Sequence, residues 1–587
     1  MLAPVRDAVL EAGDMIRAEW HRPGGRRTGN GRDKAPIDTE VEIFLRQRLL
    51  ALHACDWEGE ELARSLTGNR DRWVVDPQDG TSAFIRGHRG SAVSVALVRD
   101  DRCVLAVVHS PTAPGDRGDI FDWAEGSEAF RNGKPLPRLA DAAFGAGSVV
   151  AMNERAGDFA RHNHGVLAPA GILAVPSIAW RLVLAAAGEA DVAIGLTPGL
   201  QPHDVSAGLA LVEAVGGKAV QANGQPFVLR AGSFFTGCVA GAPSQVDAVL
   251  DRMPRLGASA SIPRRPALPR RRCPDGALLS RAQGALLGQF AGDALGAQVE
   301  FQSPGEIRKA WPDGVRSLRA GGTWNLLAGQ VTDDSEMALA LARTLVAKGD
   351  FDERAVGEAY VDWLGSHPFD IGMTTRTGIR ALQGLGQPNG ASQANGALMR
   401  VSPIGIAAGH PNRAASWGAR DAALTHPHPV CQAASAAQAA AIATGVAGGD
   451  ASAMHEAAVA AAGRFGASPI VTVLMEAKEQ GVDDALVNSG WVLIALRNAF
   501  HRLLRGESLE EALVGTVMMG GDTDTNAAIC GALLGSLQGH DAIPLAWRRQ
   551  VLGCRAVEGA GAAHPRRSTF WTDDALDLAE ALLLVSL

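Results

Sequence analysis

The segment VVDPQDGTSAF, at residues 74–84, carries the strongest structural signal in the chain. Its apolar start predicts a β-strand that delivers Asp76, and Pro77 predicts the turn that follows the strand. Asp79 comes three residues after Asp76, so both carboxylates can converge on one divalent cation across that turn. Because an Asp-x-x-Asp-Gly sequence is also common in turns without any further role, the segment needs support from other motifs.

The same segment predicts a helix that begins after the turn, at Gly80-Thr81-Ser82. The backbone N–H groups of these three residues would point outward at the helix N-terminus, which suits a phosphate group. Gly80, Thr81 and Ser82 are therefore candidate substrate-binding residues.

Acidic motifs of a similar kind recur on both sides of this segment. WEGEE at residues 57–61 contains adjacent acids, Asp38 lies at the start of a helical run, and Asp204 opens another helix. Each acid alone is typical of a helix cap or a solvated surface charge. Together, acids at several strand ends and helix starts are what a phosphatase with several metal ions requires. β-rich runs that alternate with helical stretches predict α/β or α+β layers around them.

Taken in order, these motifs resemble the inositol monophosphatase-like superfamily of metal-dependent phosphatases over residues 1–252. The resemblance rests on Asp38, GEE at 59–61, DPQDGT at 76–81, GSEAFRNGKPL at 126–136 and HDVSAG at 203–208. It implies a layered α/β (α+β) sugar-phosphatase fold in this half. It implies magnesium bound by Glu60, Asp76, the carbonyl of Gln78, Asp79 and Asp204. The catalytic set that it implies is Asp38, Glu60 and Thr81, with Asp38 and Thr81 orienting or deprotonating the attacking water.

Two positions depart from the pattern of this family. His203 stands where a tryptophan is usual, and Thr197 stands where true inositol monophosphatases have a sugar-contacting acid. The departure at Thr197 weakens inositol phosphate as the substrate, and a nucleotide 3'-phosphate or another sugar phosphate remains open.

The stretch at residues 253–275 is rich in arginine and proline and lacks apolar periodicity. It predicts an exposed, semi-extended linker between domains at 1–252 and 276–587, and a docking site for an acidic partner is the alternative. Beyond it, strand signals nearly vanish. Ala/Leu-rich amphipathic runs at 336–348 and 435–447 predict a mainly helical domain.

Three motifs stand out in this second half. GALLGQFAGDALGAQVEF at 284–301 has regularly spaced glycines, which predict closely packed helices, and it contains Asp293 and Glu300. GQVTDDSEMALALA at 329–342 and MGGDTDTNAAICGALLG at 519–535 each place acids and threonine at a helix start. A helix cap needs one acceptor, whereas each of these two motifs supplies three hard oxygen ligands. They therefore indicate a dinuclear magnesium site.

With NGALMRVSPIG at 395–405 and THPHP at 425–429, these motifs resemble the ADP-ribosylglycohydrolase family over residues 276–587. The resemblance implies an all-α fold and cleavage at the anomeric carbon of ribose. It implies two Mg²⁺ ions held by Thr332, Asp333, Asp334, Asp522, Asp524 and Thr525. It also implies an ADP-ribose cleft lined by Asn395, Gly396 and His426. Glu300 matches a mobile acid of some members, and whether Asp334, Glu300 or another acid transfers the proton stays open.

Composition narrows the function classes. The chain has 587 residues, of which 47% are hydrophobic and 20% are charged, which argues against wholesale disorder. A formal charge of -8 makes the protein a poor whole-surface nucleic-acid binder. The seven scattered cysteines form no CxxC pair and predict reduced thiols. The N-terminal helix is amphipathic and unlike a signal peptide, so we expect a cytoplasmic protein without membrane spans.

The sequence thus predicts a bifunctional magnesium-dependent hydrolase. Its N-terminal half would remove phosphate from a small phosphate ester. Its C-terminal half would release ADP-ribose from a modified protein, a nucleic acid or an ADP-ribose derivative. No membrane partner and no dedicated nucleic-acid-binding module are expected. The alternatives are one active hydrolase domain fused to a catalytically dead reader of ADP-ribose or nucleotides, and an assembly scaffold that docks through the arginine-rich linker.

Overall fold

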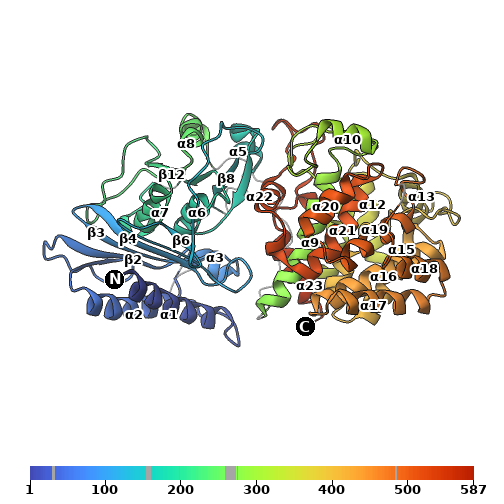
Figure 1. The fold of residues 1–587 in the computed structure, drawn as a ribbon. Helices are drawn as coiled ribbons and strands as arrows, with labels where there is room; N and C mark the ends of the chain where they lie inside the picture. The colour runs from blue at the N-terminus through green and yellow to red at the C-terminus, as the bar shows by residue number, and fades with distance from the viewer. Residues whose placement is uncertain are drawn as a thin grey trace. The chain divides into compact units, whose positions relative to one another are not determined.

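A computed structural model describes residues 1–29, 34–153, 160–196, 198–257, 273, 275–482 and 485–586. The chain divides into two compact units, Met1–Ile262 and Pro263–Leu587, which are described one at a time (Figure 1). Most of the predicted linker, at 258–272 and 274, lies outside the described residues, and so does Thr197. The domain boundaries at 252 and 276 stay predictions.

The first unit contains two β-sheets whose faces are covered by helices. Helices α1 (Leu2–Trp20) and α2 (Pro36–Leu52) pack on one face of the larger sheet. Helices α6 (Ile178–Ala186) and α7 (Pro202–Ala214) lie between the two sheets, and α8 (Pro243–Leu250) packs on the far face of the smaller sheet (Figure 1). This layering confirms the α/β (α+β) architecture predicted for the N-terminal half.

The strands of the larger sheet lie side by side in chain order, with β1 parallel to β2 and every later pair antiparallel. They are β1 (Asp56–Gly59), β2 (Asp71–Asp79), β3 (Ala92–Arg99), β4 (Arg102–Ser110), β5 (Asp119–Ala124), β6 (Phe130–Arg131) and β7 (Lys134–Pro135). The smaller sheet has the order β11-β12-β10-β8-β9, in which the pairs at β8 are parallel. Its strands are β8 (Val149–Met152), β9 (Gly171–Ala174), β10 (Val192–Gly195), β11 (Lys218–Val220) and β12 (Cys238–Gly241). The described part of the unit also contains the short helices α3 (Thr81–Arg86) and α5 (Ala160–Leu167).

Strand β2 continues past the turn that the sequence predicts. Its pairing with β3 shifts register between Asp76 and Asp79, so Pro77 lies at an irregularity inside the strand. A proline is tolerated there because a bulge leaves a backbone N–H unpaired. The chain turns instead at Gly80, whose φ of 92° is left-handed, and α3 starts at the next residue. The prediction of a turn at Pro77 was wrong, whereas the predicted helix start is confirmed.

Among the described residues, the second unit contains helices and no β-sheet, which confirms the predicted all-α fold. Helices α9 (Gly276–Gly296) and α21 (Thr523–Gln538) pack against each other along most of their lengths. A Cβ added at Gly288 would lie 2.4 Å from the carbonyl oxygen of Gly531, so the absent side chain lets the two backbones touch. This confirms that the spaced glycines of α9 serve close helix packing.

The remaining helices surround this pair. They are α10 (Pro304–Ala310), α11 (Asp333–Lys348), α12 (Glu353–Gly365), α13 (Met373–Leu382), α14 (Ser402–Ala407), α15 (Pro411–Thr425), α16 (Pro429–Val446), α17 (Ala451–Arg464), α18 (Ser468–Glu476), α19 (Val492–Leu504), α20 (Leu509–Val517), α22 (Leu545–Gly553) and α23 (Ala575–Leu583). Short 3₁₀ turns are η1 (Met253–Arg255) in the first unit and η2 (His540–Ala542) and η3 (Ser568–Phe570) in the second.

Helix α16 differs from the prediction for its sequence. The run at 435–447 was predicted to be amphipathic, but α16 is buried on nearly every side among other helices. Its many alanines leave room for neighbours all round, so no polar face remains. None of the described helices combines the length and the apolarity that crossing a membrane requires. The seven cysteines form no disulfide, as predicted, and a cytoplasmic location stays a prediction.

Candidate active sites

The first unit brings together three of the acids that the sequence singled out. Asp76 and Asp79 come from the end of β2 and Asp204 from the first turn of α7, and a carboxylate oxygen of each lies within 4.8 Å of the others. Burial and the neighbouring acids raise the pKa of Asp76 well above its usual range. Burial and repulsion from Asp204 raise the pKa of Asp79 to about 6. Such crowding is relieved only by protonation or by a compensating cation.

Uncharged hydrogen-bond donors orient the carboxylates of Asp79 and Asp204. Asp79 Oδ2 accepts hydrogen bonds from Ser177 Oγ at 2.5 Å and from the N–H of Ala179 at 2.7 Å, at the start of α6. Asp204 Oδ2 accepts from the N–H of Gln201 at 2.6 Å, just before α7, and burial raises the pKa of Asp204 to about 6. None of these donors carries a formal charge, so the negative charge of the cluster is left for another group to balance.

Glu60 joins the cluster from the loop that follows β1. The residue as a whole is exposed, but its carboxyl interacts with Asp76, Asp79 and Asp204. Desolvation of that carboxyl and repulsion from Asp204 and Asp79 raise the pKa of Glu60 to about 8. The structure therefore brings this predicted ligand to the same acids.

The loop that carries Glu60 is held from behind by Glu42 of α2, a fully buried acid. Glu42 accepts hydrogen bonds from the N–H groups of Glu61 at 2.6 Å and Leu62 at 3.1 Å. A Cβ added at Gly59 would lie 1.7 Å from Glu42 Oε1, so only glycine fits beside this carboxylate. The motif at residues 59–61 thus needs glycine for packing and acids for the cluster.

Asp38 and Thr81 lie together, as a water-activating pair requires. Thr81 Oγ1 is 3.0 Å from Asp38 Oδ2 and 2.8 Å from the carbonyl oxygen of Gln78, and its single proton can serve one of them at a time. Burial raises the pKa of Asp38 to about 7. Asp38 Oδ1 is buried and has no hydrogen-bond partner among the described residues. An acceptor oxygen with a pKa near neutrality suits a general base.

Gly80, Thr81 and Ser82 form the start of α3, next to the residues that end β2. His203 precedes Asp204, with Nε2 3.8 Å from Asp204 Oδ1. Burial lowers the pKa of His203 to about 4, so its imidazole is neutral near pH 7. It therefore adds no positive charge to the cluster.

The second unit brings Glu300 and Asp524 together with an acid that the sequence analysis missed. A carboxylate oxygen of Asp370 lies within 4.8 Å of those of Glu300 and Asp524. Asp370 lies in the loop between α12 and α13, without an adjacent acid or a helix-start motif of its own. Only its position three residues before α13 offered a signal, and that signal is too weak to single it out.

Asp333 and Asp334 lie in the first turn of α11, beside the same acids. Burial and repulsion from neighbouring acids raise the pKa values of both residues well above their usual range. Asp334 Oδ2 is 3.2 Å from Thr332 Oγ1 and 3.3 Å from Thr525 Oγ1, so it connects the starts of α11 and α21. Asp334 Oδ1 is buried without a hydrogen-bond partner among the described residues.

The helix-cap interpretation does not account for these side chains. Thr332 and Asp522 occupy the cap positions of α11 and α21, but neither side chain makes a cap hydrogen bond. Asp522 Oδ2 accepts instead from Asn395 Nδ2 at 2.7 Å. Burial raises the pKa of Asp522 and, with repulsion from Glu300 and Asp334, that of Asp524.

Asp293 near the end of α9 organises the turn before α11. Its carboxylate accepts hydrogen bonds from the N–H and hydroxyl of Thr332 at 3.1 and 3.0 Å, and from those of Ser335 at 3.1 and 2.5 Å. Burial raises the pKa of Asp293 to about 7. The sequence analysis noticed this acid without assigning it a role, and the structure makes it the support of the motif at 332–334.

The three residues predicted to line an ADP-ribose cleft lie in two places. Asn395 touches the acidic cluster through Asp522, whereas Gly396 lies against His426, whose Nε2 would be 3.0 Å from an added Cβ. His426 is fully buried, and burial lowers its pKa to about 3. Its Nδ1 is 2.8 Å from Thr425 Oγ1, and its Nε2 has no hydrogen-bond partner among the described residues.

Comparison with known families identifies the family to which each unit belongs. Residues 274–585 match the model of the ADP-ribosylglycohydrolase family, and residues 1–250 match that of the inositol monophosphatase family. The chain is a fusion of the two. We call its parts the phosphatase domain and the glycohydrolase domain.

Individual relatives match one domain each. The glycohydrolase domain is 36% identical over 300 residues to ADP-ribosyl-[dinitrogen reductase] glycohydrolase of Rhodospirillum rubrum, over 48% of this chain and 97% of that protein. The phosphatase domain is 34% identical over 213 residues to inositol-1-monophosphatase of Rhizobium meliloti, over 34% of this chain and 76% of that protein. It is also 30% identical over 205 residues to histidinol-phosphatase of Chlorobaculum parvum, over 34% of this chain and 77% of that protein.

Both families consist of metal-dependent hydrolases, and the acidic clusters of both domains fit a divalent cation. The atoms available as metal ligands are carboxylate, hydroxyl and carbonyl oxygens, which hard cations such as Mg²⁺ prefer. Asp334 Oδ1 is buried without a partner, which is costly unless a ligand satisfies it. The raised pKa values have the same origin, because like charges are crowded where a cation would compensate them.

Proposed function

We propose that the protein is a bifunctional, magnesium-dependent hydrolase. The phosphatase domain releases phosphate from a small phosphate monoester, and the glycohydrolase domain hydrolyses an ADP-ribosyl glycosidic bond. The observation that supports this most directly is that each domain gathers three carboxylates within 4.8 Å, from elements far apart in the chain. In each domain, acids with strongly raised pKa values lie in or beside that cluster.

In the phosphatase domain we assign the metal ligands to Glu60, Asp76, the carbonyl of Gln78, Asp79 and Asp204. Bound cations supply charge neutralisation at the leaving oxygen and lower the pKa of a coordinated water. Asp38, with an unpartnered Oδ1 and a pKa of about 7, accepts the proton of the attacking water, and Thr81 holds Asp38 in place. The N–H groups of Gly80, Thr81 and Ser82 bind the phosphate oxygens.

Our proposal for the phosphate ester covers a class of alcohols and not a single compound. The relatives of this domain include both an inositol-1-monophosphatase and a histidinol-phosphatase, so membership of the family does not select one alcohol. The neutral His203 beside Asp204 offers hydrogen bonding instead of the broad apolar surface of a tryptophan. We therefore propose a polar ester, such as a nucleotide 3'-phosphate or a sugar phosphate.

In the glycohydrolase domain we assign two cations to Thr332, Asp333, Asp334, Asp522, Asp524 and Thr525. Bound there, they supply charge that fixes the ribose hydroxyls and orients water. Asn395, Gly396 and His426 line the cleft for ADP-ribose. Burial and repulsion from Asp370 raise the pKa of Glu300 to about 8, which suits a group that donates a proton to the leaving group. Asp370 and Asp334 are the other acids within reach of that role.

The first carrier to test is an ADP-ribosylated protein, because the relative from Rhodospirillum rubrum is named for such a substrate. The experiment measures phosphate release and ADP-ribose release separately, in Mg²⁺, with the wild type, Asp79→Ala and Asp334→Ala. We expect Asp79→Ala to abolish only phosphate release and Asp334→Ala to abolish only ADP-ribose release. A wild type that binds ADP-ribose without releasing it from any carrier would instead establish the C-terminal half as a reader.

A further inference from the structure

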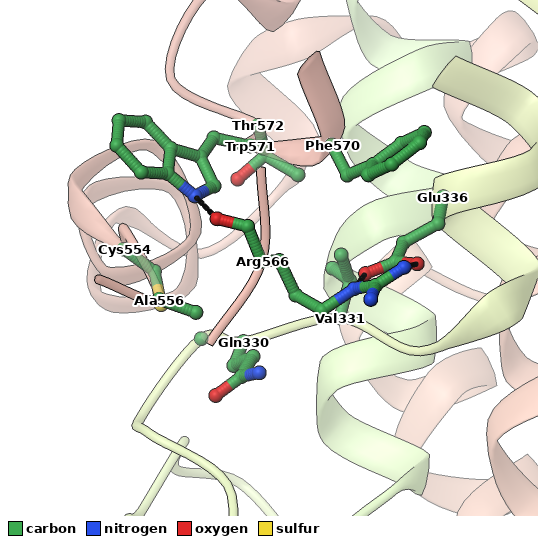
Figure 2. Close-up of a pocket in the computed structure, with 10 residues that line it drawn as sticks. Gln330, Val331, Glu336, Cys554, Ala556, Arg566, Phe570, Trp571 and Thr572 are labelled. Carbon is green, nitrogen blue, oxygen red and sulfur yellow. Dashed lines mark hydrogen bonds and ion pairs between the residues drawn. The ribbon is translucent and has the colours of Figure 1, made fainter. Parts of the chain in front are cut away.

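Residues 564–571, here called the C-terminal strap, contact segments that carry the acids of the glycohydrolase domain. Arg566 of the strap is buried, and its Nε and Nη2 donate to the two carboxylate oxygens of Glu336 at 2.6 and 2.7 Å. Glu336 lies on α11, two residues after Asp334. Figure 2 shows this pair at the edge of a pocket that Gln330 and residues of the strap also line. The strap is therefore joined to the helix that carries Asp333 and Asp334.

The same guanidinium also holds the loop that carries Asp370. Arg566 Nη1 donates to the carbonyl oxygens of Ser366 at 2.9 Å and His367 at 3.4 Å, and Nη2 donates to Ser366 Oγ at 2.8 Å. Ser366 and His367 begin the loop, between α12 and α13, on which Asp370 lies. A planar guanidinium with five donors can serve both partners at once. One buried side chain thus links Asp370 to α11.

His564, at the start of the strap, contacts neighbours of Glu300 and Asp370. Its ring stacks on Phe369, the residue before Asp370, with centroids 4.5 Å apart and planes at 24°. Its Nε2 lies 3.0 Å from the carbonyl oxygen of Trp324. Trp324 Nε1 in turn donates to Glu300 Oε2 at 2.6 Å. The strap therefore contacts the supports of both Glu300 and Asp370.

We propose that Arg566 and His564 are positioning residues that hold Asp370 and Glu300 against the acids of α11 and α21. Glu300 lies in a turn and Asp370 in a loop, so no helix keeps these acids at a fixed separation. Since neighbouring carboxylates repel one another, the two segments need an external tie to keep the cluster ready for a cation. The inference rests on the metal-dependent function proposed for this domain.

Arg343 provides a matched control within the same region. It lies on α11 like Glu336 and donates to the carbonyl oxygen of Thr569 in the strap and to both carboxylate oxygens of Asp574 just beyond it, each at 2.9 Å. These hydrogen bonds reach neither the loop at 366–370 nor Trp324. Arg343→Met therefore removes a tie between α11 and the strap without touching the supports of Glu300 and Asp370.

The test measures Mn²⁺ binding by the electron paramagnetic resonance signal of the free ion, without substrate. All proteins are full chains that also carry Asp79→Ala, so that binding in the phosphatase domain is reduced equally in each. We expect Arg566→Met to weaken Mn²⁺ binding by about tenfold or more, as loss of an outer support of a metal site does. Arg566→Lys should restore the unfolding temperature but not the Mn²⁺ affinity, because an ammonium cannot hold Glu336 and the loop together. Arg343→Met should stay within about twofold of the parent.

His564→Ala keeps the proposal testable if Arg566→Met does not fold. The partly exposed His564 can be removed at a lower structural cost, and we expect several-fold weaker Mn²⁺ binding and a lower kcat for ADP-ribose release at an unchanged unfolding temperature. The proposal is overturned if the folded variants of Arg566 and His564 bind Mn²⁺ as tightly as Arg343→Met. A parent that binds Mn²⁺ at this site but releases no ADP-ribose contradicts the proposed function while leaving the positioning test intact.

Discussion

The acids of the phosphatase domain come largely from one strand, whereas those of the glycohydrolase cluster come from two helices and two irregular segments. Asp76 and Asp79 are neighbours on β2, and one helix adds Asp204. In the other domain, the cluster depends on close contact between α9 and α21 and on the loop of Asp370. A site built from one segment is visible in the sequence, while a site built from many depends on packing.

The largest expected effect is the loss of one of the two activities when an acid of the corresponding site is replaced. Replacing Asp79 by Asn should reduce phosphate release more than about a hundredfold, because even outer partners of a metal site contribute 10- to 100-fold. Asp334→Asn should reduce ADP-ribose release by at least as much. Each variant is the control for the other, since the untouched domain should keep its rate. Steady-state assays of both products provide the measurement, and loss of both activities in either variant would contradict two separate sites.

The second prediction concerns packing between helices. Gly288→Ala places a Cβ 2.4 Å from the carbonyl oxygen of Gly531, so α9 and α21 must move apart. We expect the free energy of unfolding of the glycohydrolase domain to fall by about 1–3 kcal/mol, as for overpacked cores. Gly463→Ala on α17 is the matched control, because nothing lies within 4 Å of its added Cβ. Chemical denaturation followed by circular dichroism measures both variants, and equal stabilities would refute the close contact.

The third prediction tests the local support of the phosphatase site. Gly59→Ala forces the carboxylate of Glu42 away, because the added Cβ lies 1.7 Å from Glu42 Oε1. The loop that carries Glu60 then loses its hydrogen bonds to Glu42, and we expect phosphate release to fall about tenfold. Gly68→Ala is a weaker control because of its positive φ. An added Cβ at Gly145 makes only an ordinary contact, 4.0 Å from the carbonyl oxygen of Ala143, and its φ is ordinary, so Gly145→Ala should keep the rate. An unchanged rate in Gly59→Ala would show that Glu42 does not support the site.

The smallest expected effect is a pH dependence of stability shared by both domains. Burial raises the pKa of Asp38 to about 7, that of Glu60 to about 8 and that of Glu300 to about 8. The folded protein therefore binds more protons than the unfolded chain between pH 4 and these values, so its stability falls as the pH rises through them. Without metal, we expect the unfolding temperature to fall between pH 5 and pH 8. Thermal scans with and without Mg²⁺ measure this.

Added Mg²⁺ should oppose that fall of the unfolding temperature with rising pH. A cation binds the ionised carboxylates, so it should raise the unfolding temperature more at pH 8 than at pH 5. Asp79→Asn combined with Asp334→Asn should lose most of this rise. A metal effect of the same size at both pH values would contradict binding of the cation by the ionised acids of these clusters.

Much of both sites was predictable because the residues concerned are close in sequence. The segment at 74–84 places Asp76, Asp79 and Thr81 together through local geometry, and the motif at 332–334 does the same for Thr332 and Asp334. The errors were also local. The sequence predicts a turn at Pro77, because a proline alone does not reveal a bulge inside a paired strand. The run at 435–447 was taken as amphipathic because alanine does not reveal how many sides of a helix are covered.

The sequence by itself determined the order of the two folds, the motifs that carry the acids and the oxygen-only character of both sites. These follow from residue types and short spacings, which need no knowledge of distant neighbours. Only the tertiary structure decided that Asp370 joins Glu300 and Asp524, that Asp293 supports the turn at Thr332, and that Arg566 ties one loop to α11. These contacts join residues separated by tens to hundreds of positions. The packing of whole helices selects them, and no local pattern in the sequence records it.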